Sequence, residues 1–300
     1  MLLPATEMLS DNEAIDLLTA DRAASVFVAA QAAALQSVLQ ASPDIARGAK
    51  VMASAARSGG SLVYAAAGSS GLMALADACE LTGTFGIPSE KIQIHMAGGV
   101  PVDATMPGDT EDDAAAAVNA MQCVEAGDVV IVLSASGTTP YAVAVAECAR
   151  ANGAKVIAIA NNPGSLLLEL ADVSVCLATP PEVIAGSTRL GAGTAQKAAL
   201  NLMSSQMGID LGHVFQGQMV NVIADNTKLV GRAIGIISNI AEVSHEVAKS
   251  ALAATSGDTK SAILVAAGSS VAQADQLLHE NAGQLGPCLN DLKSKQNIKA

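Results

Sequence analysis

The chain has few aromatic residues and few charges for its length. Aromatic residues make up 2% and charged residues 15% of the 300 positions, tryptophan is absent, and the formal net charge is −12. An acidic chain that lacks aromatic side chains for base stacking and a basic patch for phosphate backbones is poorly suited to nucleic acids. We therefore expect no nucleic-acid partner. Any bound anion must be held by local groups, such as backbone amides and helix N-termini.

Metal-binding motifs are missing as well. The cysteines and histidines are scattered along the chain: Cys79, Cys123, Cys148, Cys176, Cys288, His95, His213, His245 and His279. No CxxC motif or histidine spacing typical of a metal site occurs among them. The sequence therefore predicts reduced thiols in a cytoplasmic protein that uses no metal and no other cofactor.

A secretory leader and a membrane span are not expected. Residues 1–7 lack a basic region followed by an apolar run. Apolar runs such as Val129–Leu133 have the length of a strand and fall far below the roughly 20 residues needed to span a bilayer. The longer stretch Ala23–Leu39 is rich in alanine and interrupted by serine and glutamine.

Short apolar runs, each followed by a turn and a helical pattern, recur through the middle of the chain. The expected strands cover residues 62–65, 91–96, 128–133, 155–160 and 173–177. Apolar residues make up 51% of the sequence, enough for a sizeable core. Strands that alternate with helices predict a parallel sheet covered on both faces. The predicted fold is α/β, a three-layer αβα sandwich with a mostly parallel five-stranded sheet.

Helical periodicity occupies both ends of the chain. Residues 12–57 precede the sheet, and residues 189–207 and 226–240 follow it. Three short helical patterns then cover residues 244–254, 258–266 and 270–281. We predict one domain over residues 1–242, with N-terminal helices, and a small three-helix bundle over residues 243–300. The polar tail after Leu292 is expected to fray.

Two loops have the composition of anion-binding turns. Gly68–Gly71 reads GSSG and Ser134–Thr139 reads SASGTT, and each stands between a predicted strand and a predicted helix. Glycine lets the backbone approach a ligand, and hydroxyls and helix N-terminal amides donate hydrogen bonds to phosphate oxygens. Ligands of open parallel sheets bind beyond the carboxyl ends of the strands. The alternative is that these serines and threonines only cap helices.

Several motifs between residues 50 and 240 resemble those of the N-acetylmuramic acid 6-phosphate etherases. The matching segments are Ala67–Gly71, Asp77–Glu80, Thr84–Gly86, Gly98–Gly99, Glu111–Asp112, Ser136–Gly137, Thr139–Tyr141, Asn162–Ser165, Pro181–Ile184, Gly186–Arg189 and Ala192–Lys197. The resemblance implies a SIS phosphosugar-binding domain. It also implies a carbon–oxygen lyase of amino-sugar metabolism and cell-wall recycling. That lyase cleaves the lactyl ether by elimination and water addition, giving N-acetylglucosamine 6-phosphate and lactate.

The resemblance places the catalytic pair at Glu80 and Glu111. Glu80 would protonate the leaving ether oxygen, and Glu111 would remove the proton next to the open-chain aldehyde. Taken alone, Glu80 follows an apolar helical face where a carboxylate is unexpected, whereas Glu111 reads equally as an acid at a helix N-terminus. The expected substrate-binding residues are Ser69, Ser70, Gly71, Ser134, Ser136, Gly137, Thr138, Thr139, Ser187 and Lys197. Lys197 reads equally as a solvated lysine.

The chain departs from the family pattern at two cationic positions. Leu72 and Thr138 stand where the family has arginine, and the loss of two cations weakens anion binding or moves it elsewhere. At most Thr6 and Glu7 remain of the family's N-terminal Thr-Glu-x-x-Asn-Pro segment. Three functions stay open: an etherase, a non-catalytic phosphosugar sensor, and a phosphosugar isomerase, which needs a base but no leaving-group acid.

We expect a homodimer with its site at the interface. The helices over residues 12–57 carry more apolar surface than a small sheet needs for cover, and residues 189–207 add a face of small residues. Two-fold homodimers are the commonest oligomers. In the resembled family the sugar lies where two such domains meet, so each site would borrow groups from the neighbouring chain.

Overall fold

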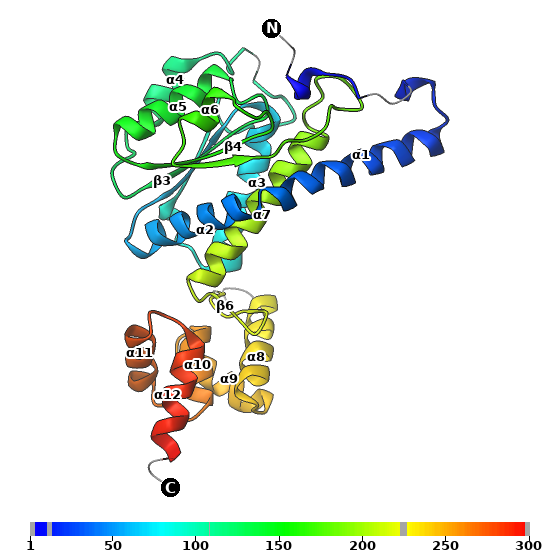
Figure 1. Ribbon diagram of the computed structural model, residues 1–300. Coiled ribbons are helices and arrows are strands. Elements are labelled where there is room, and N and C mark those ends of the chain that lie inside the picture. Colours follow the sequence, from blue (N-terminus) through cyan, green and yellow to red (C-terminus); the bar gives the residue numbers. More distant parts are fainter. Residues whose placement is uncertain (1–3, 11–13, 108, 223–226, 298–300) are drawn as a thin grey trace. The chain divides into compact units, whose positions relative to one another are not determined.

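A parallel five-stranded sheet forms the centre of the first of two compact units (Figure 1). The computed structural model describes residues 4–10, 14–107, 109–222 and 227–297. The strands are β1 (Leu62–Ala66), β2 (Ile92–Met96), β3 (Val129–Ser134), β4 (Lys155–Ala160) and β5 (Val173–Cys176), in the order β2-β1-β3-β4-β5. All four strand pairs are parallel, which confirms the predicted sheet. The strand order reverses between β1 and β3, the point where open α/β sheets bind ligands.

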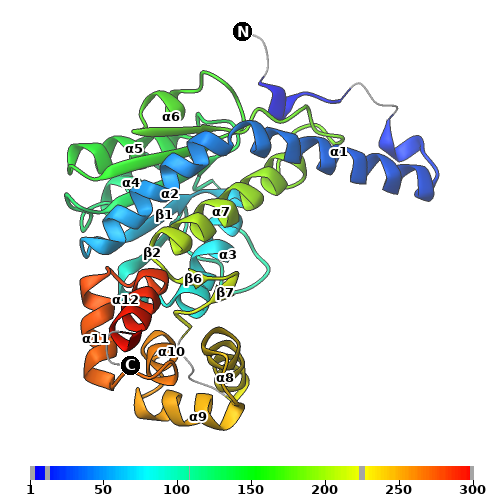
Figure 2. The same ribbon diagram turned by 60° about the horizontal axis from the view of Figure 1, so that its bottom comes forward.

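Helices cover both faces of this sheet, as expected (Figure 2). On one face lie α4 (Ala114–Ala120), α5 (Pro140–Ala151) and α6 (Leu166–Glu169), and on the other lie α2 (Ser42–Arg57), α3 (Gly68–Phe85) and α7 (Gly191–Asp210). Val130 and Val132 pack into the core under α4–α6. Ile157, which points to the opposite face, lies near Gly48 of α2 together with Met203 of α7. Because both faces are covered, β1 and β3 are buried along their whole length.

A buried carboxylate joins α3 to the sheet and to α7. Asp77 accepts hydrogen bonds from the Tyr64 hydroxyl (2.9 Å), the Asn201 amide (2.7 Å) and the Ser204 hydroxyl (3.0 Å). Burial, and then the nearby Asp77 charge and hydrogen bond, raise the pKa of Tyr64 well above its ordinary value. These bonds fix α3, and with it the serines at its first turn.

Helix α1 (Ala20–Gln40) is apolar and yet largely exposed. Only Ala34, Ser37 and Val38 are buried among its 21 residues. By length and composition it could cross a membrane, with a mean hydropathy of 1.3 over an 18-residue window that is 17% buried. One such helix near the N-terminus is weak evidence for a span, because the core helix of a soluble protein and a signal sequence pass the same test.

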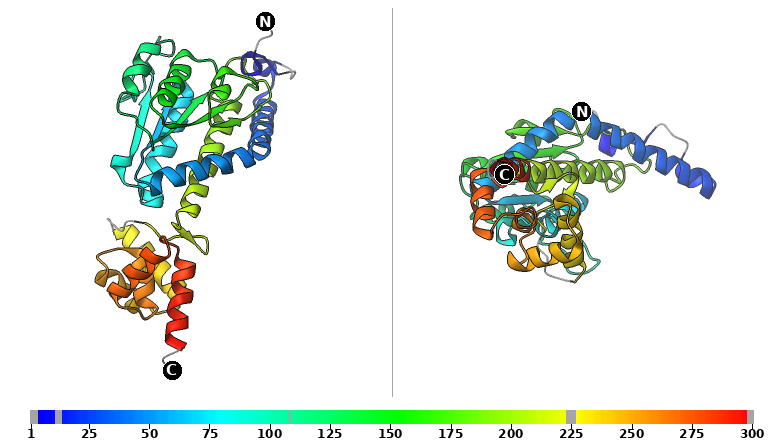
Figure 3. Two further views of the ribbon diagram at one scale, coloured as in Figure 1. Left: turned by 60° about the vertical axis from the view of Figure 1, so that its left-hand side comes forward. Right: turned by 90° about the horizontal axis from the view of Figure 1, so that it is seen from below.

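The second compact unit consists of residues 80–88 and 207–300. Figure 3 shows its C-terminal helices in yellow to red. Its described part holds the short strands β6 (Val214–Phe215) and β7 (Gln218–Met219) and the helices α8 (Thr227–Ala241), α9 (His245–Ala254), α10 (Thr259–Ala266), α11 (Val271–Glu280) and α12 (Leu285–Asn297). The described part of the first unit also contains three single-turn 3-10 helices: η1 (Ala5–Glu7), η2 (Ile15–Leu17) and η3 (Ser89–Lys91).

This unit differs from the bundle predicted for residues 243–300. Besides residues 80–88 it includes the segment from Met207 onward, because Val220, Val222 and the buried side chains of α8 share one core with α9–α12. The tail that was expected to fray after Leu292 is helical to Asn297. Leu285, Cys288 and Leu292 bury one side of α12, and this packing stabilises the helix.

Candidate functional site

A pocket of about 110 Å³ lies at the carboxyl ends of β1 and β3. It brings together residues of the loops after β1 and β3 with Glu111. The lining residues are Glu7, Ala67, Ser69, Ser70, Glu111, Leu133, Ser134, Ala135, Ser136, Thr139 and Thr188. The pocket therefore presents five hydroxyls from two loops beside a carboxylate at the point where the strand order reverses.

The loop after β3 forms a compact cluster of hydroxyls. Ser134 and Thr139 share a hydrogen bond of 2.8 Å, and Ser136 lies 3.3 Å from each of them. The Gly137 and Thr138 amides donate to Ser134 (3.0 Å) and Ser136 (3.2 Å). None of the three hydroxyls forms a side-chain cap on α5, which begins at Pro140. The cluster is thus held by backbone amides, and hydroxyls of this kind can donate hydrogen bonds to an anion.

Gly137 has two roles in this loop. Its φ of +70° lies in the left-handed region, and a Cβ there would collide with Ser165. The residue shapes the loop and does not line the pocket. Thr138 is exposed, and its hydroxyl donates to Ser136 at 3.3 Å. Both predicted residues therefore support the cluster from outside the pocket.

Glu111 reaches the pocket across the start of α3. Its carboxylate lies against Gly68, so close that a Cβ at this position would overlap Oε1. Gly68 also has a φ of +53°, which favours glycine. The backbone carbonyl of Glu111 accepts a hydrogen bond from the Tyr141 amide (3.0 Å), and the cap of α4 is Asp113, which accepts from Ala116 (2.9 Å). The acid at the N-terminus of α4 is thus Asp113, and Glu111 does not have the capping role that the alternative gave it.

Two residues that line the pocket, Glu7 and Thr188, are not among the predicted site residues. Glu7 is brought there by its neighbour Thr6, whose buried hydroxyl accepts a hydrogen bond from Asn162 (2.9 Å). The only local signal for Glu7 is the Thr6-Glu7 fragment of the family pattern. Thr188 follows the predicted Ser187, and Ser187 itself does not line the pocket.

Other predicted site residues also lie outside the lining. Gly71 is buried in α3 against Met96, where a side chain would not fit. Lys197 is exposed on α7. Glu80 is exposed on α3. In the single chain it therefore does not lie on a buried apolar face, where a carboxylate would be unexpected. The roles predicted for Glu80 and Lys197 stay predictions.

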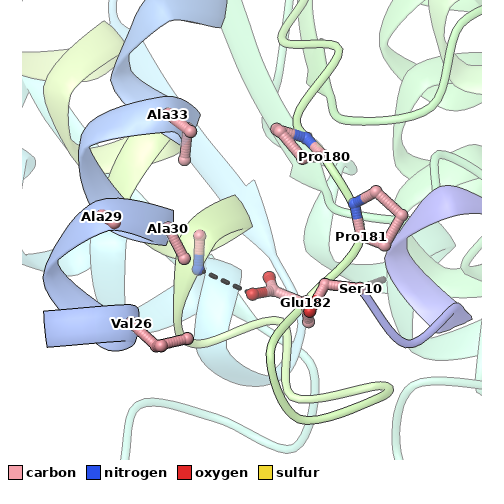
Figure 4. A pocket seen from close by; sticks show the side chains of 10 residues that line it. Ser10, Val26, Ala29, Ala30, Ala33, Pro180, Pro181 and Glu182 are labelled. Carbon is pink, nitrogen blue, oxygen red and sulfur yellow. Dashed lines mark hydrogen bonds between the residues drawn. The ribbon is translucent and has the colours of Figure 1, made fainter. Parts of the chain in front are cut away.

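A larger pocket of about 260 Å³ lies elsewhere in the first unit, between alanines of α1 and the segment Pro180–Glu182 (Figure 4). Its one buried charge is already engaged: the Glu182 carboxylate accepts hydrogen bonds from the Gly191 and Ala192 amides, each 2.9 Å long. The amides of a helix's first turn have no carbonyl partner within the helix. By accepting from two of them, Glu182 caps the N-terminus of α7. The remaining lining is mostly apolar, and this pocket offers little reactive chemistry.

Metal chemistry finds no support in the side chains that the structure describes. No group of three or more His, Cys, Asp or Glu residues could hold a metal ion within the described ranges. His95, at the end of β2, lies 3.3 Å from Gln93, and burial lowers its pKa. The five cysteines are free thiols.

Comparison with known proteins decides the family. The SIS domain profile matches residues 27–161. The N-acetylmuramic acid 6-phosphate etherase of Deinococcus radiodurans is 39% identical over 253 residues, which cover 84% of this chain and 83% of the relative. That of Microcystis aeruginosa is 36% identical, with 95% of this chain and 94% of the relative covered. This chain belongs to the N-acetylmuramic acid 6-phosphate etherase family.

The etherase-family chain also has the fold of a more distant solved structure. A Bacteroides fragilis protein assigned to the phosphosugar isomerases matches with a TM-score of 0.51 and 21% identity, covering 66% of this chain and 95% of that one. This likeness concerns the fold alone.

This member of the etherase family lacks a cation at the pocket. Among the lining residues that the structure describes, none is lysine, arginine or histidine. Leu72, one of the two departures from the family pattern, is half-buried on α3, and Thr138 is engaged with Ser136. Within the described chain, the groups that could bind an anion in this pocket are the hydroxyls and the amides at the start of α3 and α5.

Proposed function

We propose that the chain is an N-acetylmuramic acid 6-phosphate etherase that releases lactate and N-acetylglucosamine 6-phosphate. One observation carries the proposal: in a chain of this family, the Glu111 carboxylate shares a pocket with the hydroxyl cluster of Ser134, Ser136 and Thr139. A cluster of donors suits a phosphate, and a carboxylate beside it suits a base that acts on the sugar. The predicted substrate, a phosphorylated amino sugar, fits both features.

The phosphate would bind first, at the hydroxyl cluster after β3. Hydroxyls that already accept hydrogen bonds from Gly137 and Thr138 can turn their own protons toward phosphate oxygens. Ser69 and Ser70, in the first turn of α3, add donors on the β1 side. Binding at this point would hold the open-chain sugar over Glu111 and turn the proton transfer into an intramolecular step.

Elimination then requires a base and an acid. Glu111 would take the proton from the carbon next to the aldehyde, while the bond from the adjacent carbon to the ether oxygen breaks and the oxygen receives a proton from Glu80. Lactate leaves, and water adds across the new double bond to give N-acetylglucosamine 6-phosphate. The two carboxyl groups contribute about 10²–10⁴-fold each.

The acid in each pocket would come from a second copy of the chain. Glu80 follows Ser70 by ten residues on α3, which corresponds to about 15 Å along the helix axis. The phosphorus and the ether oxygen of the substrate are joined by six single bonds of about 1.5 Å, less than about 9 Å in total. The chain's own Glu80 therefore fits the same substrate poorly. We assign the acid to Glu80 of the partner subunit.

Helix α1 supports a homodimer. Val28, Leu35 and Leu39 are exposed by 69%, 41% and 69%, and their spacing places them on one side of the helix. A stripe of apolar side chains on a mostly exposed helix is typical of a contact between chains. A covered α1 also accounts for its apolar character without a membrane. We expect this dimer in the cytoplasm, in line with its free thiols.

The loss of two cationic residues supports a second candidate function. Leu72 and Thr138 in place of arginine favour a phosphosugar sensor or an altered substrate. Incubation with N-acetylmuramic acid 6-phosphate, followed by an assay for lactate, tests the proposal, with Glu111→Gln as the inactive control. Lactate release that depends on Glu111 supports the etherase. Binding of the phosphosugar without turnover would identify a sensor, and conversion between an aldose and a ketose phosphate would identify an isomerase.

A further inference from the structure

The pocket contains a second carboxylate that the proposed reaction does not use. Glu7 lines it together with Glu111, and the described lining residues offer neither of them a cationic side chain. A carboxylate acts only as a hydrogen-bond acceptor. Because a phosphate group and Glu7 repel each other, a bound phosphosugar can engage Glu7 only through a neutral donor such as a hydroxyl.

Hydrogen bonds on both sides fix the segment that carries Glu7. The Asn162 side-chain amide donates to Thr6 (2.9 Å) and also to the carbonyls of Ala135 (3.2 Å) and Ser136 (3.3 Å) in the loop after β3. On the other side, the Ser10 amide donates to the Glu182 carbonyl (2.9 Å). Glu7 itself remains exposed to the pocket. A backbone segment held next to a binding loop in this way needs little further ordering when its charged residue meets a ligand.

Glu7 and Glu111 flank the loop after β3 from opposite sides. Glu111 lies against Gly68, which follows β1. Thr6, the neighbour of Glu7, is bonded to Asn162, which follows β4. Oε2 of Glu7 lies 3.3 Å from the position that a Cβ on Gly186 would take. Since β1 and β4 lie on either side of β3 in the sheet, a phosphate at the β3 loop would have one carboxylate on each flank.

We propose that Glu7 is a specificity-determining residue that accepts hydrogen bonds from the hydroxyl groups of a bound phosphosugar. The inference rests on the proposed function, because it takes the hydroxyl cluster as the phosphate site. Glu7 makes the pocket select a phosphate that carries a polyhydroxy chain over a bare phosphate. Glu111 acts on the reacting carbon, and Glu7 holds the part of the sugar that does not react.

Two ligands and two matched variants test this role by calorimetry. N-acetylglucosamine 6-phosphate and inorganic phosphate are titrated into the wild type, Glu7→Gln and Glu147→Gln. Glu147 is exposed on α5, outside the pocket lining, so its substitution makes the same change of charge away from the site. We expect Glu7→Gln to weaken the sugar phosphate by about tenfold, equivalent to about 1.4 kcal/mol. Inorganic phosphate should bind as well or better, because a repelling charge is removed, and Glu147→Gln should change neither affinity.

Each outcome supports or overturns the inference. An unchanged affinity of Glu7→Gln for the sugar phosphate overturns it, and so does an equal gain for both ligands, which would make Glu7 a repelling charge only. A wild type that binds no sugar phosphate overturns it as well. If lactate release fails while the sugar phosphate still binds in a Glu7-dependent way, the etherase proposal falls and the role of Glu7 stands. Because Glu7 is exposed, its substitution leaves the core unaltered.

Discussion

The Glu111 carboxylate lies beside Gly68 at the start of α3, so close that a side chain at position 68 would displace it. Gly68→Ala would add a Cβ that overlaps Oε1 and would strain a φ of +53°. We expect the rate of lactate release to fall by at least about tenfold, with a loss of stability of about 1 kcal/mol or more. Steady-state kinetics and thermal unfolding measure the two effects.

Gly83→Ala is the matched control for this change. Gly83 lies on the same helix, its φ is not in the left-handed region, and an added Cβ meets no atom within 4 Å. In a helix interior, alanine is more favourable than glycine by about 1 kcal/mol. The control should therefore be active and equally or more stable. Activity of Gly68→Ala equal to that of Gly83→Ala would show that the contact between Glu111 and Gly68 has no functional role.

Loss of two hydroxyls from the cluster after β3 should affect phosphate recognition alone. In the double variant Ser136→Ala, Thr139→Ala, two donors of the proposed phosphate site disappear. Hydrogen bonds to a charged group contribute about 1.5–3 kcal/mol each, so binding of N-acetylglucosamine 6-phosphate should weaken by at least about tenfold. Binding of unphosphorylated N-acetylglucosamine should change little. If calorimetry finds both sugars weakened alike, the loop serves the fold and not the phosphate.

The features that the sequence predicts are those encoded by short stretches of chain. The strands and the loop Ser134–Thr139 follow from local apolar patterns and turn residues, and the structure has this loop between β3 and α5 as expected. Glu7 has no such local signal, because it reaches the pocket through the bond between Thr6 and Asn162, 156 positions apart. The boundary predicted at residue 242 is displaced for the same kind of reason: α8 buries its apolar side against helices that come later in the chain.

We expect Lys260 to make the stability of the second unit depend on pH. Burial lowers the pKa of this lysine to about 8, and the nearby Asp258 opposes the shift. Between pH 8 and the ordinary lysine value of about 10.4, the unfolded chain binds a proton that the folded chain has released. The free energy of unfolding contributed by Lys260 should therefore rise with pH in this window, and below pH 8 the burial of the charge costs stability.

Comparison with Lys260→Met isolates this effect. The variant keeps a long side chain without the charge, so it should be more stable than the wild type at pH 7 and lose that advantage toward pH 9.5. Thermal unfolding from pH 7 to 9.5 gives the two profiles. A constant difference in stability between the two proteins across this range would contradict a pKa of about 8 for Lys260.

A mixture of two inactive variants should recover activity if each site uses two chains. Glu111→Gln removes the base, and Glu80→Gln removes the acid that we assign to the partner subunit; the latter should still exchange the substrate's α-proton with solvent. In a mixed dimer one pocket combines Glu111 of one chain with Glu80 of the other and is complete, and the second pocket lacks both. Random pairing gives mixed dimers in half of the population, so about a quarter of the wild-type rate should return.

Lactate release is measured after the subunits are mixed under conditions that allow exchange, with each variant alone as the control. A self-contained site predicts no recovery at any ratio, and light scattering that finds an active particle of 29.9 kDa, the mass of one chain, leads to the same conclusion.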